Sequence, residues 1–141
     1  MENKITILFP LKDPDDLTLQ TLESLLNQSF QNFVIKIFIN NYKIENKNFI
    51  ISNWKTFKNR KIIINRFKKD YGQLKNVKKA FRNVNTPYFM LTTNGIIYSK
   101  NYLEILSKQF KKHSDLILST CEFAIRNREG DLIAKYPITK T

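Results

Sequence analysis

The chain has few of the residues from which disulfide frameworks and metal centres are built. It holds one cysteine, Cys121, and one histidine, His113, among 141 residues. A lone cysteine cannot form an internal disulfide, and a structural zinc site needs about four nitrogen or sulfur ligands. The sequence therefore excludes a disulfide-stapled fold, disfavours a zinc site and predicts a protein of a reducing, cytoplasmic compartment.

Long apolar runs are also missing. No stretch reaches the roughly 20 apolar residues that cross a bilayer, and the opening residues 1–4 lead into a strand-like segment rather than a signal peptide. We therefore expect no transmembrane segment. Hydrophobic residues still make up 42% of the chain and aromatic residues 13%, which predicts a single packed domain over residues 1–141.

Negative charge is scarce, with 12 acidic residues against 24 basic ones and a net charge of +12. One interpretation is attraction to polyanions such as nucleic acid, anionic lipid or a nucleotide diphosphate. The other is compositional drift, because Lys, Asn and Ile are abundant throughout. Basic residues cluster at Lys55, Lys58, Arg60 and Lys61, but no helix-turn-helix, zinc-finger or RNA-binding aromatic motif accompanies them. The sequence therefore disfavours a nucleic-acid-binding function.

Hydrophobic periodicity predicts strands that alternate with helices. The expected strands are Lys4–Phe9 (stopped by Pro10), Phe33–Ile39, Ile62–Ile64, Tyr88–Leu91 and Leu116–Ser119, followed by a hairpin of Cys121–Ile125 and Leu132–Tyr136. The expected helices begin at the Asp13-Pro14 cap, at Asn46 (ending at Lys58), after Gln73 with the apolar stripe Leu74, Val77, Phe81 and Val84, and at Tyr102. This order predicts a three-layer α/β/α fold with a mainly parallel sheet that ends in a β-hairpin.

Polar loops follow the predicted strands. Tyr88–Leu91 runs into Thr92-Thr93-Asn94-Gly95, and Phe33–Ile39 runs into Asn40-Asn41-Tyr42. Open α/β sheets bind ligands at the carboxyl ends of their strands. These loops are therefore where we expect a binding site.

Several blocks of sequence resemble the family 2 glycosyltransferases of the GT-A fold. They are the strand ending in Pro10, the block Thr21–Phe33 (TLESLLNQSFQNF), the turn Asp70–Gln73, the strand Thr86–Leu91 and the helix start Ser99–Leu103. The resemblance implies a nucleotide-sugar-binding domain related to sugar transferases. It implies donor contacts from Pro10, Leu11, Lys12, Asn41, Asp70, Gly72, Thr92 and Asn94.

The chain departs from that family where its acids should stand. The family's D-x-D, which binds Mn²⁺ or Mg²⁺, aligns with Thr92-Thr93-Asn94, and its D-D-G-S aligns with Asn40-Asn41-Tyr42-Lys43. Neutral oxygens are poor ligands for a hard divalent cation, so we expect no dedicated metal site. The family's catalytic base and acceptor-binding part lie further downstream than Thr141, so no catalytic residue is assigned. A transferase-like domain and a non-catalytic scaffold or partner subunit both remain open.

The candidate residues also have plain structural interpretations. Asn41 suits either a uracil or ribose contact or a turn, and Asp70 with Gly72 suits either a nucleotide turn or the entry to a helix. Asn94-Gly95 is typical of a tight turn. Lys12, Lys68, Lys69 and Lys75 could neutralise a diphosphate in place of metal, or they could simply be solvated. An exposed apolar edge or face would favour a homodimer.

Overall fold

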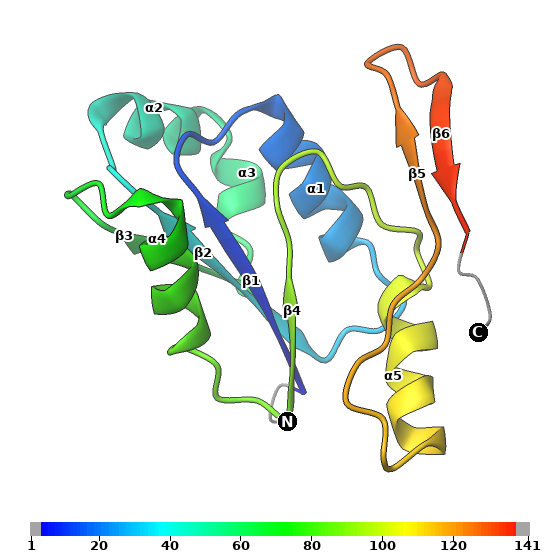
Figure 1. Ribbon diagram of the computed structural model, residues 1–141. Coiled ribbons are helices and arrows are strands. Elements are labelled where there is room, and N and C mark those ends of the chain that lie inside the picture. The colour runs from blue at the N-terminus through cyan, green and yellow to red at the C-terminus, as the bar shows by residue number, and fades with distance from the viewer. Residues whose placement is uncertain (1–3, 138–141) are drawn as a thin grey trace. The chain divides into compact units, whose positions relative to one another are not determined.

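The computed structural model describes residues 4–137 (Figure 1). The chain divides into two compact units, residues 1–103 and residues 104–141. Its elements are β1 (Ile5–Leu11), α1 (Asp16–Leu26), β2 (Phe33–Ile39), α2 (Ile44–Ser52), α3 (Trp54–Phe57), β3 (Ile62–Arg66), α4 (Gly72–Phe81), β4 (Tyr88–Leu91), α5 (Tyr102–Lys112), β5 (Phe123–Arg126) and β6 (Leu132–Tyr136). None of the helices in residues 4–137 is long and apolar enough to cross a membrane.

The first unit is built on a parallel sheet of four strands in the order β3-β2-β1-β4. Ile7 of β1 lies opposite Ile35 of β2 on one side and Met90 of β4 on the other. Because the strands are parallel, their carboxyl ends meet at one edge of the sheet, as the sequence predicts. The binding loops predicted after β2 and β4 therefore follow strands that end at the same edge.

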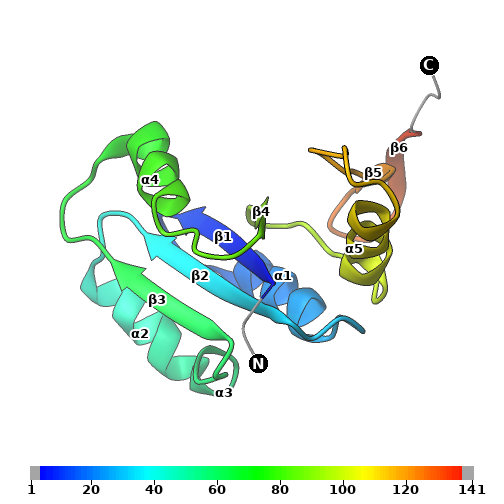
Figure 2. The same cartoon turned by 90° about the horizontal axis from the view of Figure 1, so that it is seen from below.

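Helices cover both faces of this sheet (Figure 2). Alternate residues of β1 and β2, such as Phe9 and Ile37, face α1, α2 and α3 and pack with Leu22 and Ile50. The other face carries a smaller core, in which Leu8 and Phe38 pack against Ala80 of α4. The three-layer prediction is confirmed.

Strand β1 runs through Pro10, where the sequence predicts that it stops. Pro10 is paired in register with Phe38 of β2. On the other side of β1, the register with β4 ends at the pair Leu8 and Leu91. Since β4 has ended there, no neighbouring carbonyl requires the N–H that proline lacks.

Helix α1 begins later than predicted, and Asp15 rather than Asp13 is its N-cap. The Asp15 side chain accepts a hydrogen bond from Thr18 N at 3.0 Å, and Asp15 N donates to Thr18 Oγ1 at 2.9 Å. This reciprocal capping box satisfies two backbone donors at once, which Asp13 cannot do at its position. The prediction that an aspartate caps this helix is correct, but the capping residue lies two positions later than predicted.

The helix expected over Asn46–Lys58 is two helices, α2 and α3. At Asn53 the backbone leaves the helical region (φ −112°, ψ 28°). The Asn53 side-chain amide donates to the Phe49 carbonyl at 2.9 Å. An asparagine side chain that competes in this way for a helix carbonyl favours a break.

The second unit holds most of α5 and the hairpin of β5 and β6. The hairpin is antiparallel, and Asp131 N donates to Asn127 Oδ1 at 2.8 Å across its turn. The strand predicted at Leu116–Ser119 is wrong, because this segment is irregular and leaves Ile117 95% exposed. A short apolar run without a neighbouring strand has no partner for its backbone groups.

Candidate functional site at the carboxyl edge of the sheet

Four residues after β1, β2 and β3 form a polar cluster, which we call the rim cluster: Lys12, Asn40, Asp70 and Gly72. Asp70 Oδ1 accepts hydrogen bonds from Asn40 Nδ2 at 2.7 Å and from Gly72 N at 2.8 Å. The Lys12 ammonium lies 3.1 Å from Asp70 Oδ2. One carboxylate thus ties together segments that follow three different strands.

The electrostatics of the rim cluster keep Asp70 ionised. The backbone N–H of Gly72, and after it the side chain of Lys12, lower the pKa of the Asp70 carboxyl. Hydrogen bonds donated to a carboxylate stabilise its charged form. The side chains of Asp70 and Lys12 remain 43% and 54% exposed, so an anion and a cation both face solvent at this edge.

Sequence reasoning selected Asn41, whereas Asn40 is the residue that joins the rim cluster. Asn40 is buried, and its Oδ1 accepts from Tyr71 N at 3.0 Å. Asn41 has a φ of 55°, the left-handed conformation of a turn residue. The alternation of side chains along a strand could have identified Asn40. Residues 38 and 40 point to the same side of β2, and Phe38 faces α4.

Asn76 of α4 is a second residue that the sequence analysis missed. Its amide donates to the carbonyls of Phe38 at 2.9 Å and Leu11 at 3.4 Å, so it joins the ends of β2 and β1. The side chain is buried, and its Oδ1 has no partner among the described residues. The buried side of α4 is formed by Asn76 and Ala80, and Leu74 of the predicted apolar stripe is 69% exposed.

The loop after β4 is fastened to α1. Asn94 Oδ1 accepts a hydrogen bond from Thr18 Oγ1 at 2.9 Å, and Asn94 Nδ2 donates to Asp15 Oδ1 at 3.3 Å. We call this pair of contacts the loop latch. Thr92 is buried, and its hydroxyl lies 2.8 Å from that of Tyr98. Both polar residues predicted in this loop therefore have internal partners.

The residues of this loop do not fit a divalent cation. Thr92 and Asn94 offer neutral oxygens that already take part in hydrogen bonds, and Mg²⁺ or Mn²⁺ prefers carboxylates. Across residues 4–137, no three His, Cys, Asp or Glu side chains come together as a ligand group.

The remaining predicted residues fall into two groups. Leu11 is a buried part of the main core and Pro10 is half-buried in β1. Lys68, Lys69 and Lys75 are exposed on the segment that surrounds Asp70 in sequence. The edge of the sheet thus presents a partly exposed carboxylate, Asp70, beside several exposed ammonium groups.

The sequence matches a known family, and the fold matches known structures. The family model described as glycosyl transferase family 2 matches residues 6–134. No curated protein matches the sequence. The fold matches the crystal structure of S. aureus TarS with a TM-score of 0.65 and 12% identity, over 79% of this chain and 20% of that one. It also matches S. aureus TarS 1–349 in complex with UDP, with a TM-score of 0.66 and 12% identity, over 79% of this chain and 33% of that one. The chain thus spans a fifth to a third of the length of these structures.

Proposed function

The chain belongs to glycosyl transferase family 2, and we propose that residues 4–103 bind the nucleoside diphosphate part of a nucleotide sugar at the rim cluster. The observation that supports this most directly is the exposed, ionised Asp70 carboxylate, held by donors from Asn40, Gly72 and Lys12. A fixed anion beside a cation can accept a hydrogen bond from a ribose hydroxyl or a base N–H while the cation faces phosphate.

Neutralisation of the diphosphate falls to lysines in this proposal. Lys12 stands in the rim cluster, and Lys68 and Lys69 directly precede Asp70. Lysine ammonium groups stabilise phosphate oxygens without the ligand set that a divalent cation needs. Binding should therefore be independent of Mn²⁺ and Mg²⁺.

A second candidate is a non-catalytic scaffold or partner subunit that descends from a transferase. The loop latch favours it, because Asn94 serves to join β4 to α1. The two candidates differ in one property that can be measured directly, the affinity of the purified chain for a nucleotide.

Titration calorimetry with UDP and several UDP-sugars tests the proposal. We expect heat of binding with UDP and the same Kd in Mn²⁺ and in EDTA. Asp70→Asn should weaken binding about tenfold, the factor that corresponds to one hydrogen bond to a charged group. Lys12→Met should weaken it by a similar factor.

The matched control is Lys108→Met, because Lys108 also forms an exposed ion pair, with Glu104 at 2.7 Å. It should leave the Kd for UDP unchanged. If no nucleotide produces heat, the nucleotide-binding proposal fails and the scaffold remains. If Mn²⁺ is required for binding, the lysine-based account is wrong.

A further inference from the structure

The outer flank of α2 and α3 exposes three large apolar side chains, which we call the flank patch: Ile44, Ile51 and Trp54. They are 60%, 58% and 53% exposed. Ile44 and Ile51 are two helical turns apart, so they lie on the same side of α2, and Trp54 follows at the start of α3. Single exposed apolar residues are ordinary, but three on two consecutive helices, within residues 44–54, point to an interaction surface.

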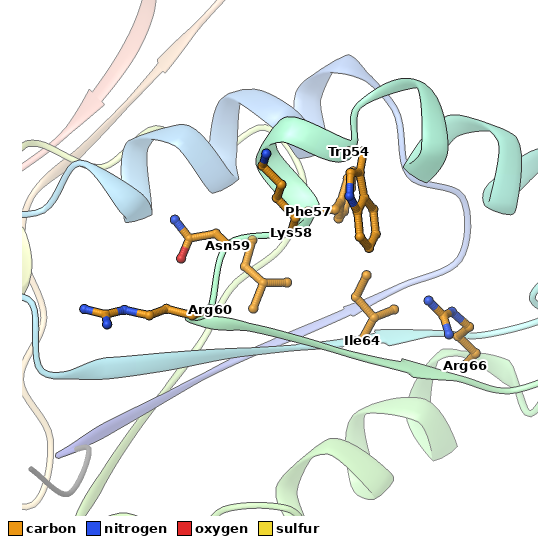
Figure 3. A pocket seen from close by; sticks show the side chains of 8 residues that line it. Trp54, Phe57, Lys58, Asn59, Arg60, Ile64 and Arg66 are labelled. Carbon is orange, nitrogen blue, oxygen red and sulfur yellow. The ribbon is translucent and has the colours of Figure 1, made fainter.

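An open hollow of about 330 Å³ lies beside Trp54 (Figure 3). Phe57, Ile62 and Ile64 give it apolar walls, and Lys58, Arg60 and Arg66 supply three cations from the end of α3, the following loop and the end of β3. None of its lining residues is acidic. The hollow therefore suits the charged head of an anionic molecule that also has an apolar part.

Positive charge is concentrated in the stretch of sequence that carries this surface. Residues 43–69 contain nine basic residues against one acidic residue, Glu45, which gives +8 out of the chain's net +12. The basic residues are Lys43, Lys47, Lys55, Lys58, Arg60, Lys61, Arg66, Lys68 and Lys69. A field of this strength selects an anionic partner.

The exposed isoleucines decide which anionic partner fits. Single-stranded nucleic acid would use the cations and could stack a base on Trp54, but it would gain nothing from Ile44 and Ile51. A bilayer surface uses all of these groups: indole rings lie at the level of the headgroups, aliphatic side chains enter the acyl boundary, and lysines and arginines bind anionic lipid. We propose that the flank patch and its surrounding cations dock this domain onto an anionic membrane surface.

Trp54 itself reports on the contact, because it is the only tryptophan of the chain. We expect its fluorescence to shift to shorter wavelength on addition of vesicles of phosphatidylcholine mixed with phosphatidylglycerol, but not with phosphatidylcholine alone. Vesicles with bromine on the acyl chains should quench it. Single-stranded RNA is the competing probe.

Two variants separate the apolar and the charged contributions. Ile44→Ser/Ile51→Ser keeps the reporter and every charge, and it should weaken vesicle partitioning about tenfold or more. Lys55→Gln/Lys58→Gln should weaken it about fivefold for each cation removed. The matched control Leu74→Ser/Lys75→Gln changes an exposed apolar residue and an exposed cation on α4, at the opposite face of the sheet, and should leave partitioning unchanged.

The outcomes distinguish the partners. A blue shift with anionic vesicles that the flank variants lose and the control keeps supports the proposal. An unshifted spectrum with every vesicle overturns it, and so does an equal loss in the control, which would show diffuse attraction. Tight binding to RNA without vesicle binding would assign the surface to nucleic acid instead. Circular dichroism of each variant verifies that it is folded.

Discussion

Replacing Asn94 by aspartate would place an acid in the loop after β4 and test what the loop latch does. In the wild-type chain, Asn94 Nδ2 donates to Asp15 Oδ1 at 3.3 Å. Asn94→Asp removes that hydrogen bond, worth about 1 kcal/mol, and sets two carboxylates against each other. At the same separation in a water-like dielectric, their repulsion adds about 1 kcal/mol. We expect a loss of about 2 kcal/mol, or about 8 °C in Tm.

The pH dependence identifies the cause of that loss. In the folded variant the introduced carboxylate faces a second carboxylate, which disfavours its charged form and raises its pKa above the unfolded value of about 3.9. The penalty is therefore complete above that folded pKa and shrinks as the pH falls through it. Thermal unfolding followed by circular dichroism at about pH 7.5 and about pH 4.5 should show a deficit that is clearly smaller at the lower pH.

Two controls separate the charge from the lost contact. Asn94→Ala loses the hydrogen bonds to Asp15 and Thr18 without adding a charge, so its deficit should not depend on the ionisation of a new group. Asn48→Asp adds the same charge at an exposed position of α2 and should be nearly neutral. If Asn94→Asp were as stable as the wild-type chain at neutral pH, the loop latch would contribute nothing to the free energy of unfolding, and the reasoning would be refuted.

Three further substitutions or reactions test other parts of the structure. Asn76→Ala removes the side-chain donor shared by the carbonyls of Phe38 and Leu11, although Leu11 O still accepts from Asn40 N at 2.9 Å, and should cost about 1–2 kcal/mol of unfolding free energy in urea; a loss under about 0.5 kcal/mol would show that water replaces the amide. Gly72 has a φ of 72° and open space around an added Cβ, so Gly72→Ala should cost only the backbone strain of about 1 kcal/mol, and an unchanged midpoint in urea would contradict that account. Burial, and after it Glu122, raise the pKa of the Cys121 thiol. Iodoacetamide should therefore alkylate the native chain more slowly than the unfolded chain, and Glu122→Gln should speed the native reaction; equal native and unfolded rates would speak against the shift.

The strands of the sheet could be predicted closely because each is a short apolar run between polar or turn-forming residues. β2 and β4 have the predicted bounds, whereas β1 continues through Pro10. Proline ends a strand only where a neighbouring strand needs its N–H, and β4 has already ended at that point. Helix boundaries were less predictable. Asp13 and Asp15 are both good caps, and only the reciprocal bond with Thr18 decides between them. Whether Leu116–Ser119 forms a strand depends on a neighbouring strand to pair with, and the hydrophobic pattern of a segment does not show whether such a neighbour exists.

Three of the four residues of the rim cluster are among the residues selected from the sequence. Lys12, Asp70 and Gly72 do come together, because parallel strands bring their carboxyl ends to one edge. Asn40 and Asn76 were missed because a buried amide is recognised by the backbone groups it satisfies, and those groups belong to other segments of the chain. The same reasoning explains why Thr92 and Asn94 could be located but their internal partners could not.

The rim cluster and the loop latch lie on different loops and share no hydrogen bond among those described, so their roles can be separated. An amide at position 94 can donate to Asp15 and accept from Thr18 at once, whereas a carboxylate there can only accept. The uncharged loop after β4 is therefore suited to hold α1, and the charges that remain for a nucleotide are those around Asp70. If this division is right, Asp70→Asn should weaken UDP binding while Tm changes little, because the isosteric asparagine keeps an oxygen that can accept from Asn40 and Gly72. Asn94→Asp should do the reverse, with a lower Tm and a Kd for UDP that stays unchanged in the folded fraction. Calorimetry below the unfolding transition of both variants measures the two effects together, and a joint loss of affinity in both would show that the cluster and the latch act as one site.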